Sequence, residues 1–386
     1  MEALLAPLQL DKFLAEIWGR CYYHGRATSP HRFAGLLSDS RFEELLSAMR
    51  PNHDILGLFK NGQRLPFDEL VMPDGAVDMV QLRSRYAEGY SIVLNGVERF
   101  SPELRQLTNA IAVELDFESQ INVYATPPLA RGFSPHFDDH DVLVLQVRGT
   151  KTWHLHTSSP IVPPERFRQK ERAVDRTTLG EPDRILLSPG DILYLPRGLV
   201  HAAETGTRAS IHLSIGFHPP TLMTLLSASL DARSLFGGKL LERLPPRYLR
   251  ERDVRKKIAA TVRSLAASIE DSDVDLGLMT LKDRLIRSGR CRTSGVFIGI
   301  TECGLSGESL VERSVPLPAR LVEADKHVGL QFSQGLVVAD PNHRCAFEYL
   351  LEQCGPFKVA DLPGLVPEAQ LALAEKLVQD GFLKEA

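Results

Sequence analysis

The chain of 386 residues has few cysteines, and their arrangement does not suggest a disulfide framework. The five cysteines are scattered and odd in number, and no two form a C-x-x-C pair. This pattern argues against a disulfide-stapled secreted domain and against a thiolate zinc site. It is typical of a protein from a reducing compartment, so we expect a cytoplasmic chain.

Long apolar runs and excess charge are also missing. No stretch of about 18 apolar residues occurs, and residues 1–6 lack the basic start of a signal peptide. We therefore expect no membrane span and no secretion signal. The 45 basic and 49 acidic residues give a net charge of −4, which provides no global attraction to nucleic acid or anionic membranes.

The pattern of apolar residues changes near residue 119. Residues 76–117 carry helical spacings of apolar residues, whereas short β-rich runs bounded by turn residues follow. Such runs predict a sandwich or small barrel, for which a jelly roll such as a double-stranded β-helix of the cupin type is a candidate. The runs cover residues 120–125, 141–148, 150–156, 184–188, 191–195 and 209–217.

Two further segments follow this β-rich part, so the expected fold class is α+β with three domains. We assign residues 1–220 to a catalytic jelly-roll domain. Residues 221–290 turn helical, and residues 291–386 mix helical and β-prone stretches, as in a winged helix.

Two of the short segments carry residues typical of metal ligands. His136 and Asp138 stand two residues apart, and His201 follows the turn sequence Pro196-Arg-Gly198. Because a strand sends residues i and i+2 to one face, His136 and Asp138 are predicted to point at the same ion. Two imidazoles and one carboxylate form the ligand set that leaves positions open on a non-heme Fe(II). The combination is much more specific than an isolated His-x-Asp pair.

Neighbouring polar residues leave alternatives open. Asp139 should face the opposite side from the ligands, and His140 would close the site if it were a fourth ligand, so we place it outside the coordination sphere. His154 and His156 share a face and could form a second metal pair, although a solvated sheet face is the more common use of such a pattern. His212 is expected in the barrel wall.

The run from Asn122 to Trp153 resembles the ribosomal oxygenases, which are JmjC/cupin-type protein hydroxylases that use Fe(II) and 2-oxoglutarate. The segment Gly132-Phe-Ser-Pro-His-Phe-Asp-Asp-His-Asp141 carries much of the likeness. The resemblance is strong over residues 90–218, and the helical and α+β segments that follow resemble the family's dimerisation region and winged helix. It implies that His136, Asp138 and His201 bind iron.

The same resemblance implies a pocket for 2-oxoglutarate. Lys151 lies fifteen residues after His136, where the family places the cation that holds the distal carboxylate. Asn122 matches a position that helps to hold the cosubstrate, and Ser214 on the last strand is expected to face it. A buried lysine needs an anionic partner, whereas without the resemblance Lys151 would be expected in solvent.

Three more residues are weaker candidates for the mouth of the pocket: Tyr124, Arg131 and Arg197. Arg197 would serve equally well as a turn residue.

We therefore expect a dioxygenase that uses Fe(II), 2-oxoglutarate and O2 to hydroxylate a protein side chain, an arginine or histidine of a ribosomal protein. A tailoring hydroxylase of a peptide or small metabolite, a lysyl demethylase and a non-catalytic cupin-like binding module are the alternatives. The complete ligand set and Lys151 disfavour the binding module.

The expected partners beyond the protein or peptide substrate follow from the last two segments. Apolar stripes in residues 221–290 suit a homodimer seam, and they suit an internal core equally well. Residues 239–263 contain nine basic and three acidic side chains, for which a solvated helix face is favoured over an RNA footprint. Residues 291–386 are rich in acids, so we expect no sequence-specific DNA binding.

Overall fold

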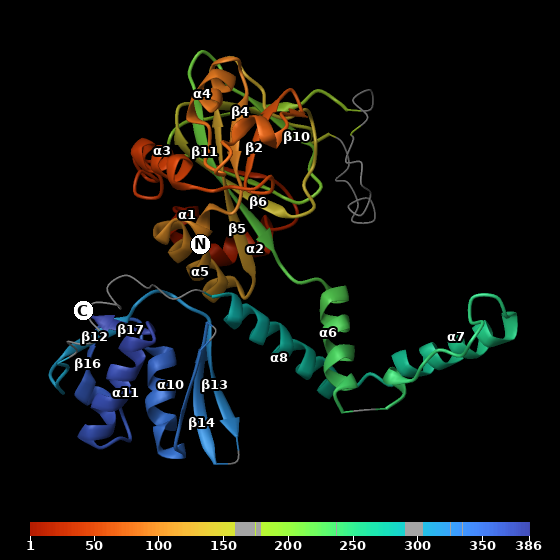
Figure 1. Ribbon diagram of the computed structural model, residues 1–386, viewed down its shortest axis with the longest axis vertical. Coiled ribbons are helices and arrows are strands. Elements are labelled where there is room, and N and C mark those ends of the chain that lie inside the picture. Colours follow the sequence, from red (N-terminus) through yellow and green to blue (C-terminus); the bar gives the residue numbers. More distant parts are fainter. Residues whose placement is uncertain (159–173, 175–178, 237, 290–303, 325, 334) are drawn as a thin grey trace. The chain divides into compact units, whose positions relative to one another are not determined.

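The computed structural model describes residues 1–158, 174, 179–236, 238–289, 304–324, 326–333 and 335–386. The chain divides into two compact units, which are described separately. The first unit comprises residues 1–114 and 118–218, and the second comprises residues 115–117 and 219–386 (Figure 1). No helix among the described residues is long and apolar enough to cross a membrane.

The first unit is built on two antiparallel sheets. The larger sheet has the strand order β1-β9-β6-β11-β5-β4-β2-β3, and the smaller has the order β10-β7-β8. The strands are β1 (Tyr23–Gly25), β2 (Leu56–Lys60), β3 (Gln63–Arg64), β4 (Ser91–Leu94), β5 (Glu118–Thr126), β6 (Asp141–Arg148), β7 (Lys151–Leu155), β8 (Asp183–Leu187), β9 (Ile192–Leu195), β10 (His201–Glu204) and β11 (Ser210–His218).

The two sheets enclose an apolar core on one side of β6. Val142 and Val144 pack there against Trp153 and Leu155 of the smaller sheet. Residues 141–146 of β6 are all buried, because both faces of this strand are covered. This explains why β6 is a nearly continuous apolar run, whereas β7 alternates.

Helices complete the first unit. They are α1 (Glu2–Leu5), α2 (Leu10–Glu16), α3 (Asp39–Ala48), α4 (Met79–Ala87) and α5 (Pro102–Leu115). Side-chain caps include Ser38, which accepts a hydrogen bond from the backbone at the start of α3, and Asp78, which accepts two at the start of α4. These caps explain where the two helices begin.

The six predicted strands agree with the structure, but β1, β2, β3, β4 and β10 were not predicted. The six predicted runs match β5 to β9 and β11 within two residues. The helical prediction for residues 76–117 was wrong at β4, a buried Ser-Ile-Val-Leu run that pairs with β5, because so short an apolar run has no readable period. The short β10 was missed because His-Ala-Ala-Glu carries no alternation of apolar residues.

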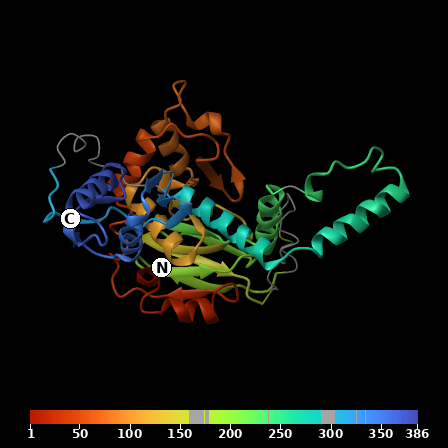
Figure 2. The ribbon, with the colours of Figure 1, turned by 90° about the horizontal axis from the view of Figure 1, so that it is seen from below.

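The second unit contains helices and two small sheets. In Figures 1 and 2, α7 extends away from the pair formed by α6 and α8. The close approach of that pair depends on Gly277, where an added Cβ would lie 2.2 Å from Ser229 Oγ. These helices are α6 (Leu222–Ser234), α7 (Arg252–Ala266) and α8 (Asp271–Ser288).

The rest of the second unit is a small α+β module. Its sheets have the orders β16-β12-β17 and β13-β14-β15, and its core includes Leu330, Phe347 and Phe382. Residues 290–303, on which the β-prone start of the predicted third domain falls, lie outside the described residues. The elements are β12 (Leu310–Arg313), β13 (Ala319–Ala324), β14 (His327–Phe332), β15 (Gly335–Ala339), α10 (Arg344–Glu352), β16 (Phe357–Lys358), α11 (Pro367–Gln379) and β17 (Leu383–Glu385).

Candidate active site

A backbone bridge brings His136 and His201 together. His136 N donates to the carbonyl of His201 at 3.0 Å, and His201 N donates back at 2.8 Å. Residues 133–140 otherwise form no strand, so the strand expected around His136 and Asp138 was wrong. Pro135 has no N–H to give to a ladder, and the chain turns before β6 begins.

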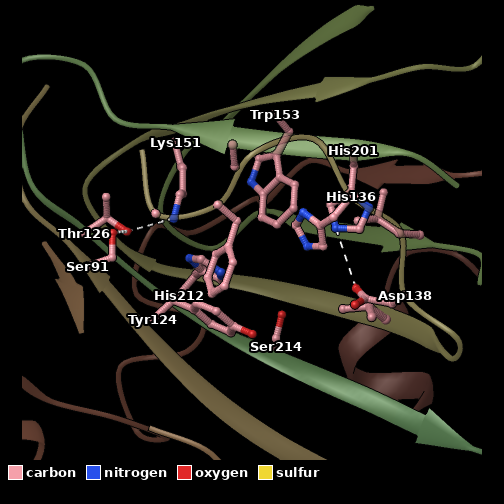
Figure 3. A pocket seen from close by; sticks show the side chains of 15 residues that line it. Ser91, Tyr124, Thr126, His136, Asp138, Lys151, Trp153, His201, His212 and Ser214 are labelled. Atoms are coloured by element: carbon pink, nitrogen blue, oxygen red, sulfur yellow. Dashed lines mark hydrogen bonds and ion pairs between the residues drawn. The ribbon is translucent and has the colours of Figure 1, made fainter. Parts of the chain in front are cut away.

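His136, Asp138 and His201 nevertheless point to one place. Their ligand atoms all lie within 4.8 Å of one another, and His201 Nε2 lies 3.6 Å from Asp138 Oδ2 (Figure 3). The turn before His201 holds the arrangement, because Gly198 N donates to the carbonyl of Asp138 at 2.8 Å. Gly198 has φ +82°, a conformation that favours glycine.

Hydrogen bonds fix the tautomers of both imidazoles. Nδ1 of His136 donates to the carbonyl of Ser134 at 2.9 Å, and Nδ1 of His201 donates to the carbonyl of Leu199 at 2.9 Å. A carbonyl only accepts, so each Nε2 keeps a free lone pair. Burial, assisted by neighbouring His136, lowers the pKa of His201 to about 4, and the ring is neutral as a metal ligand must be.

The residues beside the triad make other contacts. His140 Nδ1 lies 3.0 Å from Asp139 Oδ1, and its ring lies 4.8 Å from that of His218. His140 is not part of the triad's cluster, as expected from the need for open positions.

The suspected second metal pair does not form within the described part of the chain. His154 Nε2 contacts Glu204 Oε1 at 2.9 Å, and Nδ1 of His156 donates to the carbonyl of Gly180 at 2.9 Å. Glu204 also pairs with Arg131, which does not line the cavity beside the triad. These side chains therefore anchor loops on the smaller sheet.

A cavity of about 180 Å³ adjoins the triad between the two sheets. This is smaller than the roughly 300–1,000 Å³ of sites for drug-sized ligands, and it suits a small organic acid. Rings from Tyr124, Phe133, Trp153 and His212 form much of its wall. Figure 3 shows the triad on one side of these rings and Lys151 on the other.

Lys151 lies inside this cavity and is only 5% exposed. Its Nζ donates to Thr126 Oγ1 at 2.9 Å, and Ser91 Oγ donates to the same oxygen at 3.2 Å. No carboxylate of the described residues pairs with Lys151, and burial lowers its pKa to about 7. The cavity thus ends in a cationic group that lacks a counter-charge.

Asn122 and Ser214 face each other on β5 and β11, but only Ser214 lines the cavity. The side-chain oxygen of Asn122 accepts from Gly96 N at 3.0 Å and from Gln120 Nε2 at 2.9 Å. Tyr124 follows Asn122 by two positions on β5 and does line the cavity. Asn122 therefore lies beside the cavity wall without lining it.

Sequence reasoning missed Thr126, Trp153 and His212 as cavity residues, and it placed Arg197 among the candidates. The signal was available in strand parity: Thr126 follows Tyr124 by two positions, and Trp153 follows Lys151 by two. Arg197 is not among the lining residues, and its backbone N–H donates to Asp141 at 3.2 Å.

Comparison with known proteins agrees with this geometry. Residues 94–225 match the family model described as the JmjC domain. About a third of the chain is thus similar to a JmjC domain. The predicted JmjC/cupin fold, in a mixed α+β chain, is therefore confirmed.

Curated relatives of this chain include proteins named "Bifunctional lysine-specific demethylase and histidyl-hydroxylase NO66". The one from Drosophila yakuba is 31% identical over 224 residues, covering 56% of this chain and 32% of the relative. The one from Aedes aegypti is 31% identical over 208 residues, covering 52% and 32%. The chain thus spans about a third of the length of these relatives.

Solved structures show the same fold. The Escherichia coli ribosomal oxygenase YcfD superposes with a TM-score of 0.56 and 17% identity over 98% of both chains. A structure of YcfD in complex with cobalt and 2-oxoglutarate gives a TM-score of 0.55 with 16% identity over 98% of both chains. At 16–17% sequence identity, this similarity supports a shared fold and nothing further.

Proposed function

We propose that this chain is a dioxygenase that uses Fe(II), 2-oxoglutarate and O2 to hydroxylate a protein side chain. The observation that carries the proposal is one cavity lined by both the His136–Asp138–His201 cluster and Lys151. Lys151 is buried and has no carboxylate partner among the described residues. The free Nε2 atoms and the carboxylate fit a non-heme Fe(II). When bound, the iron supplies the oxygen-activating chemistry that couples oxidation of 2-oxoglutarate to hydroxylation of the substrate.

The chain's own residues have three tasks in this proposal. His136, Asp138 and His201 hold the metal through preset tautomers and leave its other positions open. Lys151, with Thr126 beside it, attracts the distal carboxylate of 2-oxoglutarate, which would supply the missing counter-charge.

The cavity walls orient the cosubstrate and exclude water. Ser214 faces the cavity from β11, and Tyr124 faces it from β5, two positions after Asn122. Nearly buried aromatic rings leave little room for solvent, which suits chemistry that must be protected from side reactions.

We propose a protein substrate, with an arginine or histidine of a ribosomal protein as the target. The names of the similar proteins, a histidyl-hydroxylase and a ribosomal oxygenase, support this choice. Demethylation of a methylated lysine is the second candidate, since the same relatives are also named lysine-specific demethylases. A tailoring hydroxylase or a non-catalytic binding module has no comparable support.

Mass spectrometry of ribosomal proteins from cells with and without the gene tests the substrate. We expect a histidine or arginine that is heavier by one oxygen atom only when the active protein is present. A lysine that loses methyl groups instead would favour the second candidate, and unchanged ribosomal proteins would contradict the ribosomal substrate.

We also propose the organisation of the whole chain: a catalytic domain over residues 1–220, a helical dimerisation region over 221–290 and a winged-helix-like domain over 291–386. Support for a homodimer comes from α7, in which no residue is buried although Val254, Ile258 and Leu265 follow one side. A cytoplasmic location stays a prediction, supported by the cysteine pattern.

A further inference from the structure

Two more side chains of the cavity carry buried nitrogen atoms that have no hydrogen-bond partner among the described residues. They are Nε1 of Trp153 and Nδ1 of His212, and the two residues are 5% and 2% exposed. Most buried polar atoms in native proteins are paired, because an unpaired one has lost water without compensation. Two such atoms in one small cavity point to a ligand that pairs them.

The two rings are held firmly in place. Tyr124 stacks on His212 with ring centroids 4.8 Å apart and planes 1° from parallel. Trp153 meets His212 edge-on, at 5.6 Å and 74°. In Figure 3 the indole nitrogen of Trp153 lies on the side of its ring that is turned toward Lys151.

The unused hydrogens around Lys151 match a carboxylate. An ammonium has three donors, of which Lys151 uses one on Thr126, and Thr126 accepts two hydrogen bonds without using its own hydrogen. Trp153 Nε1 only donates. His212 is neutral because burial and the charge of Lys151 hold its pKa well below the ordinary value, so one of its two nitrogens carries a hydrogen.

We propose that Trp153 and His212 are cosubstrate-binding residues whose N–H groups donate to the distal carboxylate of a dicarboxylic 2-oxo acid beside Lys151. This inference rests on the proposed function and deepens it. The four donors of this group are Lys151, Thr126, Trp153 and His212. They would make the site selective for a dicarboxylate over a monocarboxylate of equal length, because a monocarboxylate would leave all four without an acceptor.

The test replaces each ring by phenylalanine, which removes the donor and keeps a ring. In Trp153→Phe and His212→Phe we expect the KM for 2-oxoglutarate to rise about tenfold each, the usual loss for one hydrogen bond of about 1.4 kcal/mol. The KM for 2-oxopentanoate should not rise, and the metal content should stay that of the wild type. His212→Asn, which keeps a donor, should recover part of the affinity.

A direct readout follows from the tryptophan content, since Trp18 and Trp153 are the only two in the chain. Trp18 packs on Tyr194 and Phe217, outside the cavity. With manganese in place of iron, titration of Trp18→Phe with 2-oxoglutarate should change the remaining fluorescence. The matched Trp153→Phe variant should show no change.

The outcomes separate this inference from the proposed function. If the wild type neither binds metal nor converts 2-oxoglutarate, the proposed function fails and the inference fails with it. If the wild type is active while the metal-loaded phenylalanine variants keep its KM for 2-oxoglutarate, only the inference fails. The indole N–H would then serve the edge-on contact with His212 alone.

Discussion

At the scale of single residues, Lys151 connects the chemistry of the site to its energetics. A cation that is 5% exposed and has no carboxylate partner is unfavourable in the free protein, which is why burial lowers its pKa to about 7. A bound dianion reverses this by supplying the missing charge. The charged form of Lys151 is therefore unfavourable in the free protein and is stabilised when the dianion is bound.

Replacing the ammonium by an apolar chain of similar length tests this role. Lys151→Met should weaken 2-oxoglutarate binding by about 10- to 100-fold, because a hydrogen bond to a charged group contributes about 1.5–3 kcal/mol. Metal content, measured by elemental analysis, should stay unchanged. A variant that lost its metal would contradict the role given to Lys151.

The pH dependence of binding follows from the same pKa. Below about pH 7 Lys151 is already protonated in the free protein, whereas above it the free side chain loses its proton. Binding must then take up a proton, so affinity for 2-oxoglutarate should fall by up to about tenfold per pH unit above pH 7. Calorimetric titrations from pH 6 to 9 measure this, and Lys151→Met should lack the dependence.

At the scale of elements, a buried hydrogen-bond network supports the turn that carries His201. The hydroxyl of Tyr194 on β9 donates to Asp141 Oδ1 at 2.7 Å and accepts from Gly19 N at 2.8 Å. Asp141 also accepts from Arg197 N at 3.2 Å, one residue before Gly198. The start of β6 is thereby tied to both the N-terminal segment and the metal-binding turn.

Removing this hydroxyl should be costly. Tyr194→Phe removes the acceptor of Gly19 N and one of the two donors to Asp141 Oδ1, so the free energy of unfolding should fall by about 1–3 kcal/mol in urea denaturation. The exposed Tyr248→Phe is the matched control and should stay within about 0.5 kcal/mol of the wild type. Equal stabilities for the two variants would rule out the network as a support.

How far the sequence predicts the site also depends on the element. The period-two pattern of β5, β7 and β11 predicts which side chains share a face, but the interior position of Lys151 was predicted only from the family resemblance, since a lysine is otherwise expected in solvent. The approach of His136 to His201 could not be predicted, because it depends on a backbone bridge between loop residues far apart in the chain. Spacing places Asn122 on the same face as Tyr124, but it does not reveal that only Tyr124 lines the cavity.

At the scale of the whole molecule, every residue of the proposed site belongs to the first unit. The second unit carries α7, the helix in which no residue is buried. Val262 on α7 is 57% exposed, and the rest of the apolar side is at most half-buried. Such a face in a folded protein indicates a partner. The helical region could be predicted from its stripes, but its packing could not, since the same stripes fit an internal core.

The dimer proposal is tested by a charge on this face. Ile258→Asp should halve the molecular mass measured by light scattering, without loss of helicity, because no residue of α7 is buried within the chain. Lys256 lies two residues before Ile258, which at about 100° per residue places it on the opposite side of the helix. Lys256→Asp should therefore leave the mass unchanged. A wild type that is already monomeric would contradict the proposal.

The central claim is that the His136–Asp138–His201 cluster holds an iron that oxidises 2-oxoglutarate. The most direct measurement is succinate formed by purified protein with Fe(II), O2 and 2-oxoglutarate, alongside metal content. We predict succinate from the wild type and from His140→Ala, and neither succinate nor bound metal in His136→Ala. A wild type that forms no succinate and binds no more metal than His136→Ala would contradict the account.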